Sequence, residues 1–365
     1  VTLTGLTISQ PGRMVVNGAI VPVQAAIKVV GSTTGTNTVS SCILQGFDYA
    51  NGHGILYGTT SGNPTLTVTN PTIKDAPTYG TGIQALGLGT ASPTLTVNGG
   101  TFTNLYSDAI VASGGDTGGG GLTLNVSGVT FSSAPASGTN GLDVVSNGNG
   151  NVTINIATNT FTGVAGAGVI NLTSYLNSSL NGSITGNTIQ NTDSRGINYR
   201  ADDSSYSNLT IQNNQMWNVT REGIYMDYRH NLAQTSNLKI LNNVLGDAAR
   251  PVGQSFYRAL RVLVRNDSGS GRLLQLRMDG NTMVSNTSAT EQVRLSADVG
   301  STLYATVTNN VFNNLTPGSP NLVVTTLDAL STICLNLNNN TANSYNLVNA
   351  AGTFRVTNLA SISAN

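Results

Sequence analysis

Side chains that can transfer protons are concentrated in one stretch of the sequence. Residues 193–298 hold 22 of the 32 charged residues, whereas residues 1–192 hold eight. Two carboxylates on opposite sides of a glycosidic bond can hydrolyse it, and a lyase or an epimerase needs a base beside the sugar ring. The candidate catalytic residues are therefore Asp202, Asp203, Glu222, Asp227, Arg229 and His230.

The same stretch holds side chains that suit a sugar ligand. Aromatic rings offer an apolar face with a polar edge, and an arginine side chain can donate two parallel hydrogen bonds to a carboxylate. No spacing motif links these residues, so the prediction rests on their types and their clustering. The candidate ligand-binding residues are Arg200, Trp217, Tyr225, Tyr228, Arg261 and Arg265.

Charges in this stretch alternate in sign from one sequence repeat to the next. One position of the repeat reads Arg195, Glu222, Arg258 and Glu291. One outward position reads Arg200, Asp227, Leu263 and Ser296 in successive repeats. A second outward position reads Asp202, Arg229, Arg265 and Asp298. Opposite charges on neighbouring strands predict ion pairs on a solvent-facing sheet, each exposed pair contributing about 0.2–1 kcal/mol. From the sequence, a structural ladder and a binding surface are both open interpretations.

A repeat defines the elements that position these residues. Short segments of alternating apolar residues are each followed by a large apolar residue, and most of these residues are 26 to 30 positions apart. Such alternation is typical of short strands, and glycine before the next apolar site permits a bend. The pattern predicts twelve turns of a solenoid with almost no helix. The marker residues are at positions 8, 47, 73, 102, 131, 161, 189, 216, 245, 283, 312 and 342.

Asparagine recurs at one position of the repeat, two residues before the apolar marker. Stacked asparagine amides can donate and accept hydrogen bonds from one strand to the next. Seven consecutive occurrences therefore predict a ladder of side chains that joins the turns. Its members are Asn159, Asn187, Asn214, Asn243, Asn281, Asn310 and Asn340.

Together, the repeat and the asparagine ladder resemble the right-handed parallel β-helix superfamily, which includes pectate-lyase-like enzymes, phage tailspikes and the passenger domains of bacterial surface proteins. The resemblance covers residues 1–365 and implies a right-handed coil with three sheets. We therefore expect an all-β fold in which residues 1–365 form one continuous solenoid, with a charged and aromatic subregion at 193–298. We also expect this solenoid to be a segment of a longer chain.

Composition excludes several classes of partner. Only 9% of the residues are charged and the formal net charge is zero, so no basic excess would attract nucleic acid or an anionic membrane surface. The sequence contains no window of 18 apolar residues, so it predicts no transmembrane span. The sequence also contains no motif for a metal or another cofactor, and we expect none.

The expected function is that of a non-catalytic, exported structural protein, a stalk, matrix element or adhesin. We expect it outside the cell or at the cell surface, with a polysaccharide or a host-surface glycan as partner. One alternative is a polysaccharide lyase, glycoside hydrolase or uronate epimerase that acts at residues 195–298. Another is a subunit that associates end to end or laterally, for instance into a fibre.

Overall fold

The structure is a computed structural model, and its described residues form β-strands without a helix. Contacts between Cα atoms divide the chain into two compact units, Val1–Leu172 (unit 1) and Thr173–Asn365 (unit 2). The expectation of one continuous solenoid stays a prediction. The described residues are 1–9, 13–16, 19–22, 25–30, 34–47, 52–76, 80–115, 118–132, 139–229, 235–246, 257–265, 272–285, 291–314 and 318–357.

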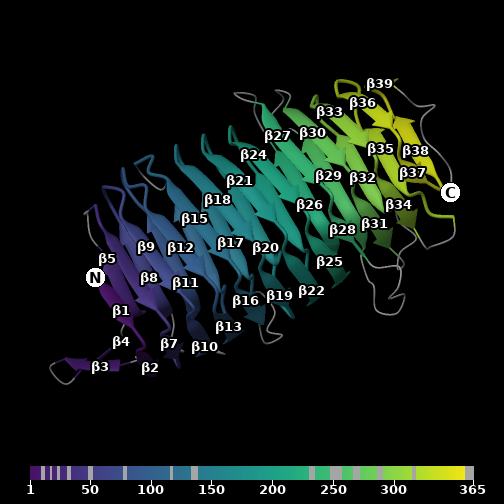
Figure 1. Ribbon diagram of the computed structural model, residues 1–365. Coiled ribbons are helices and arrows are strands. Elements are labelled where there is room, and N and C mark those ends of the chain that lie inside the picture. The colour runs from purple at the N-terminus through teal and green to yellow at the C-terminus, as the bar shows by residue number, and fades with distance from the viewer. Residues whose placement is uncertain are drawn as a thin grey trace. The chain divides into compact units, whose positions relative to one another are not determined.

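The fold is a right-handed parallel β-solenoid in which each full turn adds one strand to each of three sheets (Figure 1). We name them sheet 1, sheet 2 and sheet 3 in the order in which the chain enters them. In unit 1, sheet 1 contains β1 (Thr2–Thr4), β6 (Thr36–Ser40), β9 (Thr65–Thr69), β12 (Thr94–Asn98), β15 (Leu122–Ser127) and β18 (Asn151–Ala157). Its sheet 2 contains β2 (Thr7–Ser9), β7 (Ile43–Gln45), β10 (Thr72–Ala76), β13 (Thr101–Leu105), β16 (Thr130–Ser132) and β19 (Thr160–Thr162). Its sheet 3 contains β5 (Ala25–Val30), β8 (His53–Thr59), β11 (Thr81–Gly87), β14 (Ile110–Gly114) and β17 (Leu142–Ser146).

Unit 2 repeats the same three sheets. Its sheet 1 contains β21 (Ser179–Thr185), β24 (Tyr206–Gln212), β27 (Ser236–Leu241), β30 (Leu273–Asp279), β33 (Thr302–Thr308), β36 (Thr332–Asn338) and β39 (Thr353–Thr357). Its sheet 2 contains β22 (Thr188–Thr192), β25 (Gln215–Val219), β28 (Val244–Leu245), β31 (Thr282–Ser285), β34 (Val311–Asn314) and β37 (Thr341–Ala342). Its sheet 3 contains β23 (Ile197–Ala201), β26 (Glu222–Arg229), β29 (Arg258–Arg265), β32 (Val293–Ala297), β35 (Leu322–Thr326) and β38 (Tyr345–Asn349). Strand β20 (Ile170–Ser174) contains residues of both units.

In the described residues, sheet 2 contains 12 strands, one for each repeat that the sequence predicted. An antiparallel hairpin of β3 (Arg13–Val16) and β4 (Ala19–Pro22) interrupts the first repeat, while β28 and β37 are only two residues long.

Strand alternation places the apolar residues of the repeat inside the coil. In unit 1, Leu66 pairs with Leu95, and Leu95 with Leu124, and all three side chains are fully buried. The rings of Phe102 and Phe131 stack at 5.1 Å between centroids. Because side chains at alternate positions point to opposite faces, threonine and asparagine occupy the outward positions of the same strands.

The asparagine ladder is confirmed in unit 2. Asn187, Asn214, Asn243, Asn281 and Asn310 each donate a side-chain hydrogen bond to the next asparagine of the series, at 2.8–3.0 Å, and Asn340 ends the series. All six side chains are buried. Their amides therefore link neighbouring turns and leave few unpaired polar groups at the corner between sheets 1 and 2.

In unit 1, the ladder residue Asn159 bonds to the backbone of the preceding turn. Its side chain accepts a hydrogen bond from the Val129 amide and donates one to the Val126 carbonyl, both at 3.0 Å. The Asn159 side chain is 1% exposed. A buried asparagine at this corner thus satisfies backbone groups that the bend removes from the sheets.

Candidate functional site

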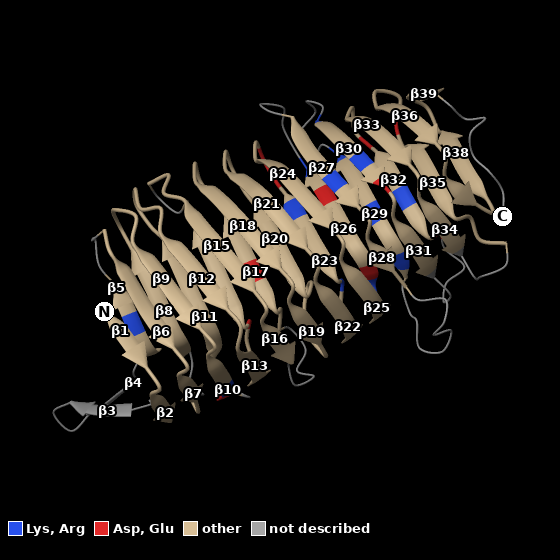
Figure 2. Ribbon diagram, viewed as in Figure 1, with Lys and Arg blue, Asp and Glu red and all other residues tan. Residues whose placement is uncertain are grey.

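The outward face of sheet 3 in unit 2 carries the predicted charged cluster, which we call the arginine face. Figure 2 shows charged residues gathered on β23, β26, β29 and β32. The predicted register is confirmed, since Arg200 pairs with Asp227, Asp227 with Leu263, and Leu263 with Ser296. The arginine face consists of Arg195, Arg200, Asp202, Glu222, Tyr225, Asp227, Arg229, Arg258, Arg261, Arg265, Glu291 and Arg294.

One edge of the arginine face is a ladder of alternating charges. Arg195 Nε lies 2.9 Å from a Glu222 carboxylate oxygen, and Arg258 Nη1 lies 4.0 Å from the other. Arg258 Nε donates to Glu291 at 2.8 Å. The predicted alternation is therefore confirmed.

The expectation that these pairs are solvent-exposed is wrong. Glu222 is 4% exposed and Arg258 is 7% exposed. The side chains of the neighbouring turns are long enough to cover one another, so each charge is shielded by its partners. Removing one member would leave its partner buried without a counter-charge, which costs more than breaking an exposed pair.

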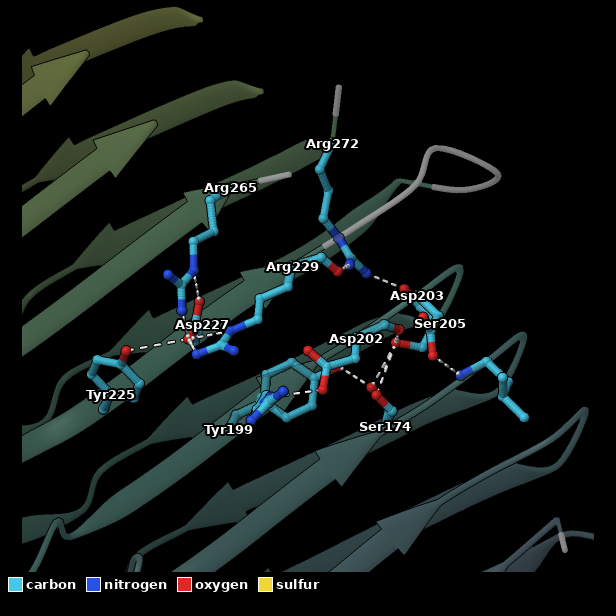
Figure 3. A network of polar contacts seen from close by, with 12 residues as sticks. Ser174, Tyr199, Asp202, Asp203, Ser205, Tyr225, Asp227, Arg229, Arg265 and Arg272 are labelled. Carbon is cyan, nitrogen blue, oxygen red and sulfur yellow. Dashed lines mark hydrogen bonds and ion pairs between the residues drawn. The ribbon is translucent and has the colours of Figure 1, made fainter. Parts of the chain in front are cut away.

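Asp227 is the centre of a second charged group (Figure 3). Its carboxylate accepts hydrogen bonds from Arg229 Nε at 2.8 Å, from Arg265 Nη2 at 2.8 Å and from the Tyr225 hydroxyl at 3.3 Å. Asp227 is only 1% exposed. Burial by itself raises the pKa of this carboxyl, but hydrogen bonds and positive charge from Arg265 and Arg229 outweigh burial and lower it below its ordinary value.

These contacts decide what the carboxylates can do. A general acid near neutral pH needs a raised pKa, whereas the pKa of Asp227 is lowered. Glu222 accepts an arginine hydrogen bond and lies against a second arginine, and Asp202 pairs with Arg200 at 2.6 Å. Each carboxylate therefore positions arginine side chains rather than facing outward as a free acid or base.

Arg261 and Arg294 have unused hydrogen-bonding capacity. They are direct neighbours in the register of β29 and β32. Within the described residues, the buried Nε of each has no hydrogen-bond partner, and Arg261 makes no ion pair. The Arg261 guanidinium lies 5.6 Å from the centre of the Tyr225 ring, and that of Arg195 lies 4.2 Å from it. Tyr225 thus stands beside two cations on an outward surface.

Several predicted residues do not lie on this face. Tyr228 points into the core with 0% exposure, because Ile224, Met226 and Tyr228 are alternate residues of β26. Trp217 lies on β25 of sheet 2. Asp203 follows β23 at a positive φ of 56° and accepts a hydrogen bond from the Leu176 amide. His230 lies outside the described residues.

Tyr228 belongs to a buried polar cluster below the arginine face. Its hydroxyl lies 3.3 Å from Ser207 Oγ, and its ring lies 5.6 Å from the Arg272 guanidinium. Arg272, only 1% exposed, donates to the backbone carbonyls of Arg229 and Ser205, as Figure 3 shows. Burial lowers the pKa of Arg272. The burial of Arg272 could not be predicted from the sequence, because an arginine beside a strand ordinarily predicts a solvated surface position.

A second pair of carboxyls that the sequence did not single out lies in unit 1. Burial raises the pKa of Asp108 to about 6, and the charge of Asp143 contributes to that rise. Burial also raises the pKa of Asp143. Their hydrogen-bond donors are amides, the Asn140 backbone at 2.7 Å and the Asn171 side chain at 2.8 Å. These two pKa shifts could not be predicted from the sequence, because burial causes them. Both carboxyls also lie outside the charge-rich stretch at 193–298.

Comparison with protein-family models, curated proteins and solved structures finds no match. Within the described residues, no three histidine, cysteine, aspartate or glutamate side chains are grouped as metal ligands. The part of the chain described by the structure also contains no helix suited to crossing a membrane.

Proposed function

We propose that this chain is a non-catalytic, exported β-helical protein whose arginine face binds an acidic polysaccharide. The observation that carries the proposal is the neighbouring pair of outward arginines Arg261 and Arg294, of which Arg261 makes no ion pair within the described residues. A sugar carboxylate would accept hydrogen bonds from such arginines. The face of Tyr225 supplies apolar area beside them.

The charge of the face supports an anionic ligand. Seven arginines stand against four carboxylates in the arginine face, which leaves three positive charges. The carboxylates hold Arg195, Arg229 and Arg265 in place. Such pre-positioned cations lose less side-chain entropy when a ligand binds.

The state of Asp227 supports binding rather than catalysis. Its lowered pKa and its arginine partners suit an ionised structural carboxylate, not a proton donor. We therefore prefer non-catalytic binding to the alternative functions of lyase, hydrolase and epimerase. The stalk, matrix or adhesin role, the extracellular location and membership of the right-handed parallel β-helix superfamily belong to this same proposal, supported by the solenoid fold and its asparagine ladder.

Calorimetric titration of the chain with polygalacturonate and with neutral dextran tests the ligand. We expect polygalacturonate to bind, dextran not to bind, and affinity to fall as salt screens the charges. The double variant Arg261→Ala/Arg294→Ala should lose this interaction at the arginine face. The control Lys74→Ala removes an exposed cation of sheet 2 in unit 1, outside the arginine face, and should preserve it.

The same samples distinguish binding from catalysis. Unsaturated or reducing ends should not accumulate during prolonged incubation with polygalacturonate or alginate. Their release by the wild-type chain, with loss of release in Asp227→Ala, would establish the enzymatic alternative. Failure of all acidic polysaccharides to bind at low salt would refute the proposed ligand. Surface labelling of intact producing cells tests the location, and a signal only after lysis would contradict export.

A further inference from the structure

The outward face of sheet 1 in unit 2 has a hollowed surface of its own, which we call the Tyr304 groove. Two hollows, each with a volume of about 290 Å³, share Tyr304 and Thr306. The first is lined by Asn237, Lys239, Gln275 and Arg277 as well as the backbone between them, and the second by Cys334, Asn336, Arg355 and Thr357.

Strand register explains the shape of the groove. Gln275, Tyr304 and Cys334 are neighbours in one row, and Arg277, Thr306 and Asn336 in the next. The Tyr304 side chain, 46% exposed, rises above shorter neighbours such as Thr306 and Cys334. A large ring between short side chains leaves one hollow on each side of it.

The chemistry of the groove suits an acidic sugar. Lys239 makes no ion pair within the described residues, and Arg355 lines the other hollow. Arg277 pairs with Asp279 at 2.7 Å, and these two charges cancel. Lys239 and Arg355 therefore give the groove a positive excess. Gln275 and Asn336 provide amides that can donate to and accept from hydroxyl groups. The exposed ring of Tyr304 offers a stacking surface to the apolar face of a sugar.

The size of the groove limits the ligand. Each hollow lies near the lower end of the range of about 300–1,000 Å³ that is typical of small-molecule sites, so each has room for a single ring. Their centres are separated by roughly two strand spacings, about 10 Å, and Tyr304 stands between them. One ring of a linked sugar chain spans about one strand spacing, so three consecutive rings cover both hollows, with the middle ring over Tyr304.

We propose that the Tyr304 groove is a second binding site, which takes three consecutive residues of an acidic polysaccharide independently of the arginine face. The two sites lie on different sheets of unit 2 and share no residue. Lys239 and Arg355 bind sugar carboxylates, Tyr304 stacks on a ring, and Gln275 orients hydroxyl groups.

The number of oligosaccharides bound per chain tests this second site. Calorimetric titration with tetragalacturonate should give two sites for the wild-type chain and one for Tyr304→Ala. Tyr304→Phe keeps the ring and should keep both sites. Tyr345→Ala is the matched control, because Tyr345 is similarly exposed, at 42%, but lies on β38 of sheet 3.

The outcomes separate this inference from the function proposed for the arginine face. The triple variant Arg261→Ala/Arg294→Ala/Tyr304→Ala should lose both sites. The double variant Arg261→Ala/Arg294→Ala and the single variant Tyr304→Ala should each keep one site. If Tyr304→Ala binds as many oligosaccharides as wild type, the groove is not a site, whatever the arginine face does. If only the Tyr304-dependent site is found, the groove stands and the function proposed for the arginine face fails. Equal binding of neutral maltotetraose would overturn the acidic class, and circular dichroism must show that every variant is folded.

Discussion

Sheet 3 is built on the same backbone pattern in both units, yet its outward carboxyls behave in opposite ways. In unit 2, Asp227 accepts hydrogen bonds from two arginines and its pKa is lowered. In unit 1, Asp143 on β17 accepts a hydrogen bond from the Asn171 side-chain amide, and burial raises its pKa. Burial is therefore common to both sites, and the charge of the partner decides the direction of the pKa shift.

The largest effect should come from Asp227→Ala. This change leaves Arg229 and Arg265 without their shared carboxylate, and breaking such a buried pair costs about 3–5 kcal/mol of unfolding free energy. Urea unfolding at neutral pH measures the loss. Asp193→Asn, at an exposed position in the same unit, should change stability by less than about 0.5 kcal/mol. Equal stability of Asp227→Ala and wild type would contradict the importance of the arginine partners.

The pH dependence of Asp227 has a defined sign. Its folded-state pKa lies below the unfolded value, so its stabilising contribution is present above the unfolded pKa, near 4, and is lost as pH falls through the folded pKa. The stability difference between wild type and Asp227→Ala should therefore shrink in acid. A difference that grows below pH 4 would show that the sign is wrong.

Glu222→Gln should have the next largest effect, about 2 kcal/mol, because the amide keeps one acceptor oxygen but removes the charge between Arg195 and Arg258. A matched change in unit 1 is Asp75→Asn, which removes the charge of an exposed pair with Lys74. That variant should lose less than about 0.5 kcal/mol. Thermal unfolding of the two variants compares them directly, and equal losses would mean that burial of the ladder is unimportant.

Asp108→Asn should have a smaller effect of opposite sign, a gain of about 1 kcal/mol at pH 8. The folded-state pKa of Asp108 is above its unfolded value, so its contribution is full below about pH 4 and is lost as pH rises through about 6. The gain should be absent at pH 4, where the aspartate is protonated in the folded state. Unfolding curves at pH 4 and pH 8 measure it, and a loss of stability at pH 8 would show that Asp108 is not strained by ionisation.

The smallest effect on stability should come from Arg261→Ala, within about 0.5 kcal/mol, because Arg261 makes no ion pair in the described structure. Its affinity for polygalacturonate should nevertheless fall. Unfolding and calorimetry on the same preparation separate the two quantities. A large loss of stability together with unchanged binding would make Arg261 a structural residue and would remove the contrast with Asp227.

Much of the solenoid could be predicted from the sequence because each repeat specifies its own register. Apolar spacing alone aligns Leu95 with Leu124, and Arg200 with Asp227, and both pairs are strand partners in the structure. The binding candidates were harder to predict. Closeness in sequence predicts that Tyr225 and Tyr228 share one surface, but strand alternation points the Tyr228 ring inward and the Tyr225 ring outward.

The sequence by itself determined the repeating strands, the inward apolar residues and the asparagine ladder, because these depend on periodicity and on contacts between equivalent positions of adjacent turns. Tertiary structure decided which charges are buried and what surrounds them. Arg272 reaches the carbonyls of Arg229 and Ser205 across 43 and 67 residues of sequence, and Asp227 is shielded by Arg265, 38 residues away. Such contacts depend on where long side chains bend and what covers them, and local periodicity contains no information about either.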